Sequence, residues 1–153
     1  YLDRLGVLDA ETLCVHCVQV GGDDIALLAG RRSGVCLCPG SNRFLGVGRA
    51  PVPALLAAGI LPAIGTDSLA SNPLLSIWRE MRVMMEDHPA LDPATVFAMA
   101  TRGGAQALGR AGDYGTLAAG KKASLLAVAY DGPGRDLFEF LVSVGNNAAV
   151  TWL

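Results

Sequence analysis

Three polar side chains of the sequence stand where short apolar segments end: His16, Asn42 and Asp67. An imidazole or a carboxylate can bind a metal ion or transfer a proton. Taken singly, each residue has an ordinary structural explanation, as a core histidine, a loop-shaping amide or a helix-capping carboxylate. Taken together, they indicate a catalytic or metal-binding site, provided that the elements before them end at one edge of the fold.

The segments around these residues predict three strands separated by helices. Apolar, strand-favouring runs occupy residues 11–18, 34–38 and 60–65. Helical patterns occupy residues 23–32, 51–59 and 74–86, and the last of these places five side chains at helical spacing: Leu75, Trp78, Met81, Arg82 and Met85. This alternation favours parallel strands whose carboxyl ends meet at one edge. The near-continuous apolar character of the strands is expected where both faces of a sheet are covered.

The spacing of these units predicts an α/β fold class. Each strand–helix unit takes roughly 25–30 residues, as in a (β/α)8 TIM-type barrel of about 250 residues. Three units cannot close a barrel, so a partial barrel is expected over residues 1–112, with a loop at residues 39–50. A further helix is expected at residues 92–109, where Asp92 and Pro93 form its start and the Gly103-Gly104 pair invites close packing. Residues 113–153 predict a smaller unit, with strands at 123–130 and 148–153 and a turn at 131–135.

Composition restricts the partners that the chain is expected to have. The 153 residues are 52% hydrophobic and carry a formal net charge of −2, with no basic stripe, so nucleic-acid binding is not expected. No apolar run is long enough to cross a bilayer, so membrane association is not expected either. The high apolar share indicates either an unusually rich core or apolar faces that are buried against a further segment or another chain.

Four cysteines, Cys14, Cys17, Cys36 and Cys38, lie in the strand-like runs rather than in loops. Reduced, buried thiols of a cytoplasmic protein are the favoured interpretation. A structural zinc ion bound by four sulfur atoms is the alternative. Because side chains alternate along a strand, Cys14 and Cys17 should point to opposite sides, whereas Cys36 and Cys38 should share a face.

Several ordered motifs resemble the deaminase and chlorohydrolase branch of the amidohydrolase superfamily. They are His16-Cys17-Val18, the run 38–46, the run 65–72 with Gly65-Thr66-Asp67-Ser68, Glu80-Met81-Arg82, and the runs 98–105 and 115–123. These motifs span roughly residues 13–129 in the order that the family has. Such a series is far more specific than a single short pattern.

The resemblance implies the C-terminal portion of an adenosine-type, guanine or triazine deaminase. Residues 1–112 would carry the sixth to eighth barrel strands, and residues 113–153 would carry C-terminal strands of a small β-sandwich. Asp67 resembles the aspartate after the eighth strand, a metal ligand that also moves protons of the hydrolytic water. His16 resembles the histidine after the sixth strand, which contacts that water or the developing oxyanion. Asn42 and Ser68 are expected to contact the substrate.

The reaction implied by the resemblance removes an amino or halide group from a purine-like, nucleoside-like or triazine ring. Water activated by Zn2+ or Fe2+ would carry it out. The family's His-x-His pair and fifth-strand histidine have no counterpart, because the chain contains two histidines, His16 and His88. Since three protein ligands are usual for catalytic zinc, the isolated chain is expected to be inactive and largely free of metal.

An unpaired first strand would offer an edge for pairing with another chain. We therefore expect homo-oligomerisation or association with a preceding segment. Two other functions stay open on the sequence: a non-catalytic α/β module that binds a partner, and a small protein with a zinc ion on its four cysteines.

Overall fold

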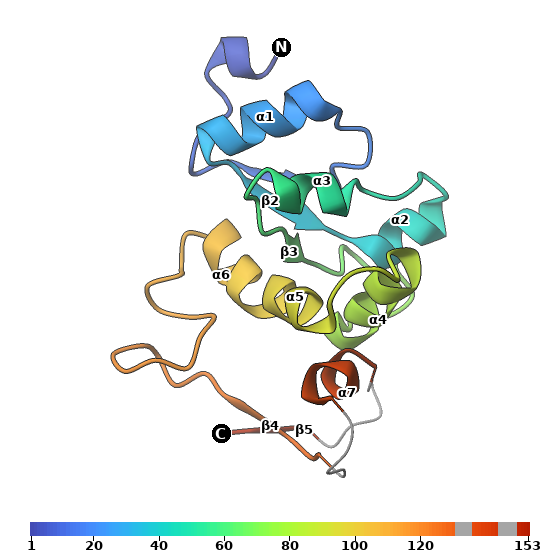
Figure 1. Cartoon of the computed structure of the whole chain (residues 1–153), viewed down its shortest axis with the longest axis vertical. Helices are drawn as coiled ribbons and strands as arrows, with labels where there is room; N and C mark the ends of the chain where they lie inside the picture. Colours follow the sequence, from blue (N-terminus) through green and yellow to red (C-terminus); the bar gives the residue numbers. More distant parts are fainter. Residues whose placement is uncertain (131–135, 144–149) are drawn as a thin grey trace.

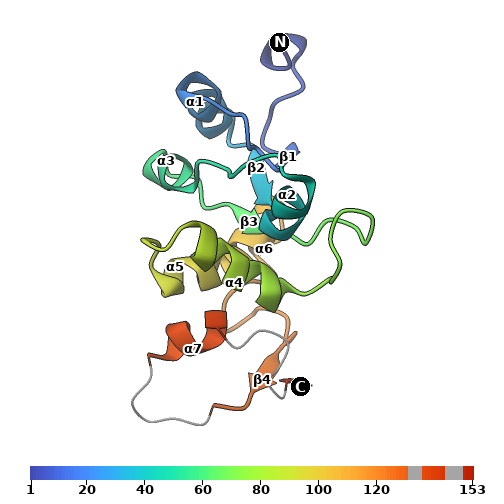
Figure 2. The same cartoon turned by 90° about the vertical axis from the view of Figure 1, so that its right-hand side faces the viewer.

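The computed structural model describes residues 1–130, 136–143 and 150–153 (Figure 1). After a short turn of 3-10 helix, η1 (Asp3–Leu5), the chain forms a three-stranded parallel sheet in the order β1-β2-β3. The strands are β1 (Leu13–Val15), β2 (Gly34–Leu37) and β3 (Ala63–Ile64). Helices α1 (Gly22–Arg31) and α3 (Val52–Ala57) belong to the two crossovers and lie on one side of the sheet (Figure 2). The predicted parallel arrangement is confirmed.

Local signals explain where the next helices begin. The hydroxyl of Ser76 accepts a backbone hydrogen bond at the start of α4 (Ile77–Asp87). The carboxylate of Asp92 does the same at the start of α5 (Pro93–Ala98), as its Asp-Pro sequence predicts. These side chains bind N–H groups that the first turn of a helix leaves without partners.

The core lies between the sheet and the helices that cover one of its faces. Val35 and Leu37 of β2 are 1% exposed and pack into this core. The apolar residues that surround them are Ile25, Leu28, Val52, Leu55, Met81, Met84, Val96 and Met99. On the other face, Leu13 and Val15 of β1 are 37% and 47% exposed. Ala63 of β3 lies on the same face and is 5% exposed, so the expectation that both faces are covered holds at β3 and is wrong at β1.

Two segments differ from their predicted structure. The connection after β2, predicted as a loop, begins with the helix α2 (Pro39–Leu45). Proline fits at its first position because an N–H group there would have no partner within the helix. The single helix predicted at residues 92–109 is divided into α5, a π-helical turn η2 (Met99–Gly103) and α6 (Gly104–Ala107).

The buried face of α4 agrees with the predicted one at Trp78, Met81 and Met85, which belong to the core or pack against it, and differs at the other two positions. The buried residues are Glu80, Met81, Val83 and Met84. Leu75 lies before the helix and is 53% exposed, and Arg82 is exposed as well. The helix turns a carboxylate inward because Glu80 has hydrogen-bond partners in the interior, which a pattern of apolar residues does not reveal.

The last part of the chain forms a second, smaller layer. Strand β4 (Leu126–Val128) pairs antiparallel with β5 (Val150–Trp152), and α7 (Leu137–Ser143) contacts α4 and α5. Both strands lie within their predicted runs, although β4 is shorter than expected. The turn predicted at residues 131–135 lies outside the described residues. The division between residues 112 and 113 and the β-sandwich remain predictions. Among the described helices, none combines the length and apolar character that crossing a bilayer requires.

Candidate active site

The carboxyl ends of the three parallel strands bring the predicted site residues to one edge of the sheet. The pairing of β1 with β2 continues through His16, whose backbone N–H donates to the carbonyl of Cys36 at 2.8 Å. Beyond this pairing, the backbone enters the left-handed region at His16 and Cys17, with φ of 68° and 48°. Asp67, beyond the end of β3, also has a positive φ, of 59°. Such values are uncommon for residues other than glycine and often mark functional sites.

The imidazole of His16 lies between the other two predicted residues. Its Nδ1 is 2.9 Å from the amide oxygen of Asn42, and its Nε2 is 3.7 Å from Oδ2 of Asp67. Because an amide oxygen accepts hydrogen bonds, Nδ1 must carry the proton in this contact. In the neutral ring, Nε2 then presents its lone pair on the side of Asp67. The imidazole and carboxylate side chains are 37% and 31% exposed, so both can be reached from solvent.

Two serine hydroxyls hold the carboxylate of Asp67. Ser71 and Ser41 each donate a hydrogen bond of 2.8 Å to its Oδ2. These bonds, with that of Ser71 the larger influence, lower the pKa of Asp67, and a backbone hydrogen bond from Ser68 acts in the same direction. The carboxylate is therefore ionised near neutral pH, as a proton acceptor or metal ligand must be.

The other two predicted residues lie in different surroundings. Asn42 is 4% exposed, and its amide oxygen is engaged by His16. Ser68 is exposed in the loop after β3, where its hydroxyl accepts a hydrogen bond from the backbone of Ala70. Contact of either residue with a substrate stays a prediction.

A buried polar network lies beside these residues and was not predicted. The carboxylate of Glu80, which is 0% exposed, accepts hydrogen bonds from Gly40 N at 2.6 Å and from the amide of Asn72 at 2.8 Å. The same amide nitrogen of Asn72 donates to the carbonyl of Thr66. A sequence signal for Glu80 does exist. This acidic residue stands four positions before the buried Met84, on the core-facing side of an amphipathic helix.

The four cysteines are free thiols, and the described residues contain no group of three or more His, Cys, Asp or Glu side chains placed to hold a metal ion. The alternative of a zinc ion bound by four cysteines is therefore wrong. As predicted, Cys36 and Cys38 share a face, since a Cβ atom at Gly65 would lie 2.8 Å from Sγ of Cys36 and 3.5 Å from Sγ of Cys38.

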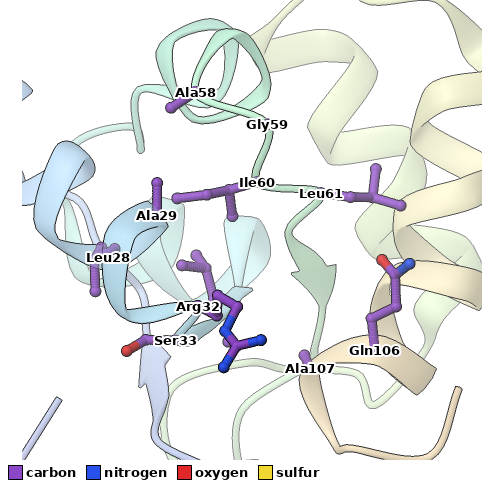
Figure 3. A pocket seen from close by; sticks show the side chains of 12 residues that line it. Leu28, Ala29, Arg32, Ser33, Ala58, Gly59, Ile60, Leu61, Gln106 and Ala107 are labelled. Atoms are coloured by element: carbon purple, nitrogen blue, oxygen red, sulfur yellow. The ribbon is translucent and has the colours of Figure 1, made fainter. Parts of the chain in front are cut away.

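A pocket of about 240 Å³ lies at the opposite end of the sheet (Figure 3). It opens where β2 and β3 begin, between Ser33, Leu61 and Ala107, with the guanidinium of Arg32 beside it. Active sites of parallel α/β folds lie instead at the carboxyl ends of the strands. The cluster around His16 and Asp67 is therefore the stronger candidate for chemistry.

The model of the amidohydrolase family matches residues 1–151. The chain belongs to the amidohydrolase family. It is 43% identical over 134 residues to a 5-methylthioadenosine/S-adenosylhomocysteine deaminase of Moorella thermoacetica, covering 83% of this chain and 31% of that protein.

Solved structures agree with this assignment. An adenosine deaminase of Xanthomonas campestris with bound zinc matches with a TM-score of 0.85 and 37% identity, over 92% of this chain and 35% of that one. An atrazine chlorohydrolase of Arthrobacter aurescens, in complex with zinc and atraton, matches with a TM-score of 0.83 and 25% identity, over 95% of this chain and 35% of that one. The α/β units of this chain are therefore of the TIM-barrel type found in amidohydrolases.

The chain spans about a third of the length of these relatives. Although these two amidohydrolase structures contain zinc, the part of this chain that the structure describes does not supply a complete zinc site. Asp67 and His16 are its two candidate donors at the strand ends, whereas catalytic zinc usually has three protein ligands. Any further ligands must come from outside the residues that the structure describes.

Proposed function

We propose that this chain supplies part of the active site of a metal-dependent deaminase. The substrates would be purine nucleosides such as 5′-methylthioadenosine, with triazine-like rings as a related class. The observation that carries the proposal is the convergence of His16 and Asp67, whose Nε2 and Oδ2 atoms lie 3.7 Å apart at the carboxyl edge of the sheet. An imidazole beside an ionised carboxylate suits proton transfer in hydrolysis.

In this proposal, Asp67 offers one ligand to the metal ion and carries a proton from the hydrolytic water to the leaving group. Ser41 and Ser71 keep the carboxylate ionised and fix its orientation. His16, oriented by Asn42, places Nε2 where it can bind the water or the developing oxyanion. A bound zinc ion would lower the pKa of its water toward neutrality, as in other metallohydrolases; Fe2+ is the alternative metal.

The proposal is tested with a chimera in which residues 1–153 replace the matching third of the Moorella deaminase. We expect the chimera to bind zinc and to release ammonia from 5′-methylthioadenosine. Asp67→Asn should lower kcat by about 10²–10⁴-fold, the contribution typical of a proton-transferring group. Asp113→Asn is the matched control, because its carboxylate is in an exposed turn and forms two long ion pairs of 3.9 Å.

The isolated chain gives the second half of the test. We expect it to contain much less than one zinc ion per molecule and to release no ammonia, because it lacks a set of three ligands. Stoichiometric zinc with turnover in the isolated chain would contradict the incomplete site. A zinc-loaded chimera whose activity survives Asp67→Asn would contradict the role of Asp67. A folded chimera without zinc or activity would favour a non-catalytic binding module.

A further inference from the structure

The carboxylate of Glu80 is fully buried, although the reaction proposed above assigns it no chemistry. Burying a charge is unfavourable unless hydrogen bonds and an opposite charge compensate for it. Glu80 meets this condition through Gly40 N, through the amide of Asn72 and through the guanidinium of Arg79, whose Nη1 lies 3.3 Å from Oε1. Such a complete set of partners indicates a specific task for this charge.

Two sets of hydrogen bonds extend from the Glu80 carboxylate, and each is called an arm of the network. The first arm is the hydrogen bond from Gly40, and it holds the helix that carries Ser41 and Asn42. Gly40 lies in the first turn of α2, where N–H groups have no partner inside the helix. The residue before this helix, Cys38, provides no side-chain cap. Oε2 of Glu80, from the neighbouring helix α4, accepts the Gly40 hydrogen bond instead. The position of Asn42, two residues further on, therefore depends on α4.

The fit around Gly40 leaves no room for a side chain. A Cβ atom at this position would overlap Oε1 of Glu80 and would lie 2.7 Å from Nη1 of Arg79 and 2.9 Å from Nδ2 of Asn72. Real Cβ atoms essentially never approach other atoms so closely. The backbone of α2 is thus seated directly on the buried network.

The second arm holds the loop that carries Asp67. Nδ2 of Asn72 donates both to Oε1 of Glu80 and to the carbonyl of Thr66, each at 2.8 Å. Thr66 immediately precedes Asp67. The two oxygens of one carboxylate therefore reach the backbone beside Ser41 on one side and, through Asn72, the backbone beside Asp67 on the other.

We propose that Glu80 is a positioning residue that fixes the spacing between α2 and the Asp67 loop and thereby orients His16. Its significance for catalysis rests on the proposed deaminase function. Asn42 is the link to the imidazole, since its amide oxygen receives the Nδ1 hydrogen bond. If the arms of Glu80 are broken, the Asn42–His16 bond loses its fixed geometry, and the ring is free to exchange tautomers.

The test uses nuclear magnetic resonance of the 153-residue chain without metal or substrate, at about pH 8. The chain has two histidines, so the ring nitrogens of His16 are identified by comparison with a His88→Gln variant. In the unsubstituted chain we expect the His16 proton on Nδ1 and slow hydrogen exchange at Gly40 N–H.

Glu80→Gln keeps the shape of the side chain but replaces one accepting oxygen by a donor. The remaining oxygen should face Asn72 and Arg79, which both donate to Oε1, so the hydrogen bond from Gly40 N–H should be the one that breaks. We expect Gly40 N–H to exchange at least about tenfold faster, as for the loss of a hydrogen bond to a charged group, and His16 to become a mixture of tautomers. Glu86→Gln is the matched control, because it removes an exposed carboxylate of the same helix that pairs with Arg43 of α2. It should leave both signals unchanged.

Asn42→Ala separates the effect of Glu80 on α2 from the effect of Asn42 on the imidazole. In this variant His16 should become a mixture of tautomers, while Gly40 N–H should still exchange slowly with solvent. If Glu80→Gln does not fold, Glu80→Asp takes its place, since the shorter side chain keeps the charge but cannot span both arms. An Nε2–H tautomer in the unsubstituted chain would overturn the proposal. So would a Glu80 variant that exposes Gly40 N–H without changing His16. The spectra need no turnover, so an inactive chimera would count against the deaminase function and not against the positioning role.

Discussion

The two adjacent glycines of the η2–α6 junction allow a sharp test of the packing that supports the site. Both have helical backbone angles, so alanine suits the backbone at either position. A Cβ at Gly103 would lie 2.5 Å from the carbonyl oxygen and 3.2 Å from the carbonyl carbon of Pro62, next to β3. A Cβ at Gly104 would have no atom within 4 Å. The same substitution therefore meets the backbone beside β3 at one position and open space at the next.

The expected free energies follow from this difference. Replacing glycine by alanine in a helix stabilises the folded state by about 1 kcal/mol, and both variants share this gain. Overpacking typically destabilises by about 1–3 kcal/mol, and Gly103→Ala should lie at the upper end because a backbone carbonyl cannot rotate away. The shared gain cancels when the variants are compared, so Gly103→Ala should be about 2–3 kcal/mol less stable than Gly104→Ala.

Thermal unfolding followed by circular dichroism measures this difference. At roughly 2–4 °C for each kcal/mol, Gly104→Ala should raise Tm by a few degrees. Gly103→Ala should lower Tm below that of the unsubstituted chain. Equal Tm values for the two variants, or a higher Tm for Gly103→Ala, would refute the close approach of η2 to Pro62 and with it this account of how β3 is supported.

Two further predictions concern ionisation and thiol chemistry. Ser71→Ala should raise the pKa of Asp67 toward its ordinary value. The lowered pKa of Asp67 stabilises the fold above the ordinary carboxylate pKa, and this stabilisation is lost as the pH falls through the lowered value; in the variant it should be smaller, and its loss should be complete at a higher pH. An NMR titration of the Asp67 carboxyl carbon and acid unfolding would check this. In native thiol labelling near pH 8, Cys36 should react before Cys17: a hydrogen bond from Cys38 lowers the pKa of Cys36, whereas burial raises that of Cys17 to about 11. Mass spectrometry that found Cys17 labelled as fast as Cys36 would contradict this order.

The strand–helix alternation and the position of the site could be predicted from the sequence because both depend on local patterns. Apolar runs fix where β1, β2 and β3 lie, and parallel strands bring their carboxyl ends to one edge. His16, Asn42 and Asp67 follow these runs directly, so their convergence needs no knowledge of side-chain packing.

The residues that hold the site could not be predicted in the same way. The contact between Glu80 and Gly40 joins positions 40 residues apart, and Ser41 of α2 donates a hydrogen bond to Asp67 in the loop after β3. These partners are fixed by tertiary packing, which leaves little trace in hydrophobic periodicity. The π-helical turn η2 was not predicted either; its last residue, Gly103, packs against the backbone of Pro62, which is distant in the sequence.

If His16 and Asp67 have the roles proposed for them, their positive φ angles oppose stability to activity at this edge of the sheet. A left-handed backbone is unfavourable by about 1–2 kcal/mol for a residue other than glycine. Glycine at either position would relieve that penalty and would delete the imidazole or the carboxylate. Laboratory evolution of this chain for heat resistance alone would thus tend to replace these two residues, whereas evolution of the proposed deaminase for turnover as well would keep them and gain stability elsewhere.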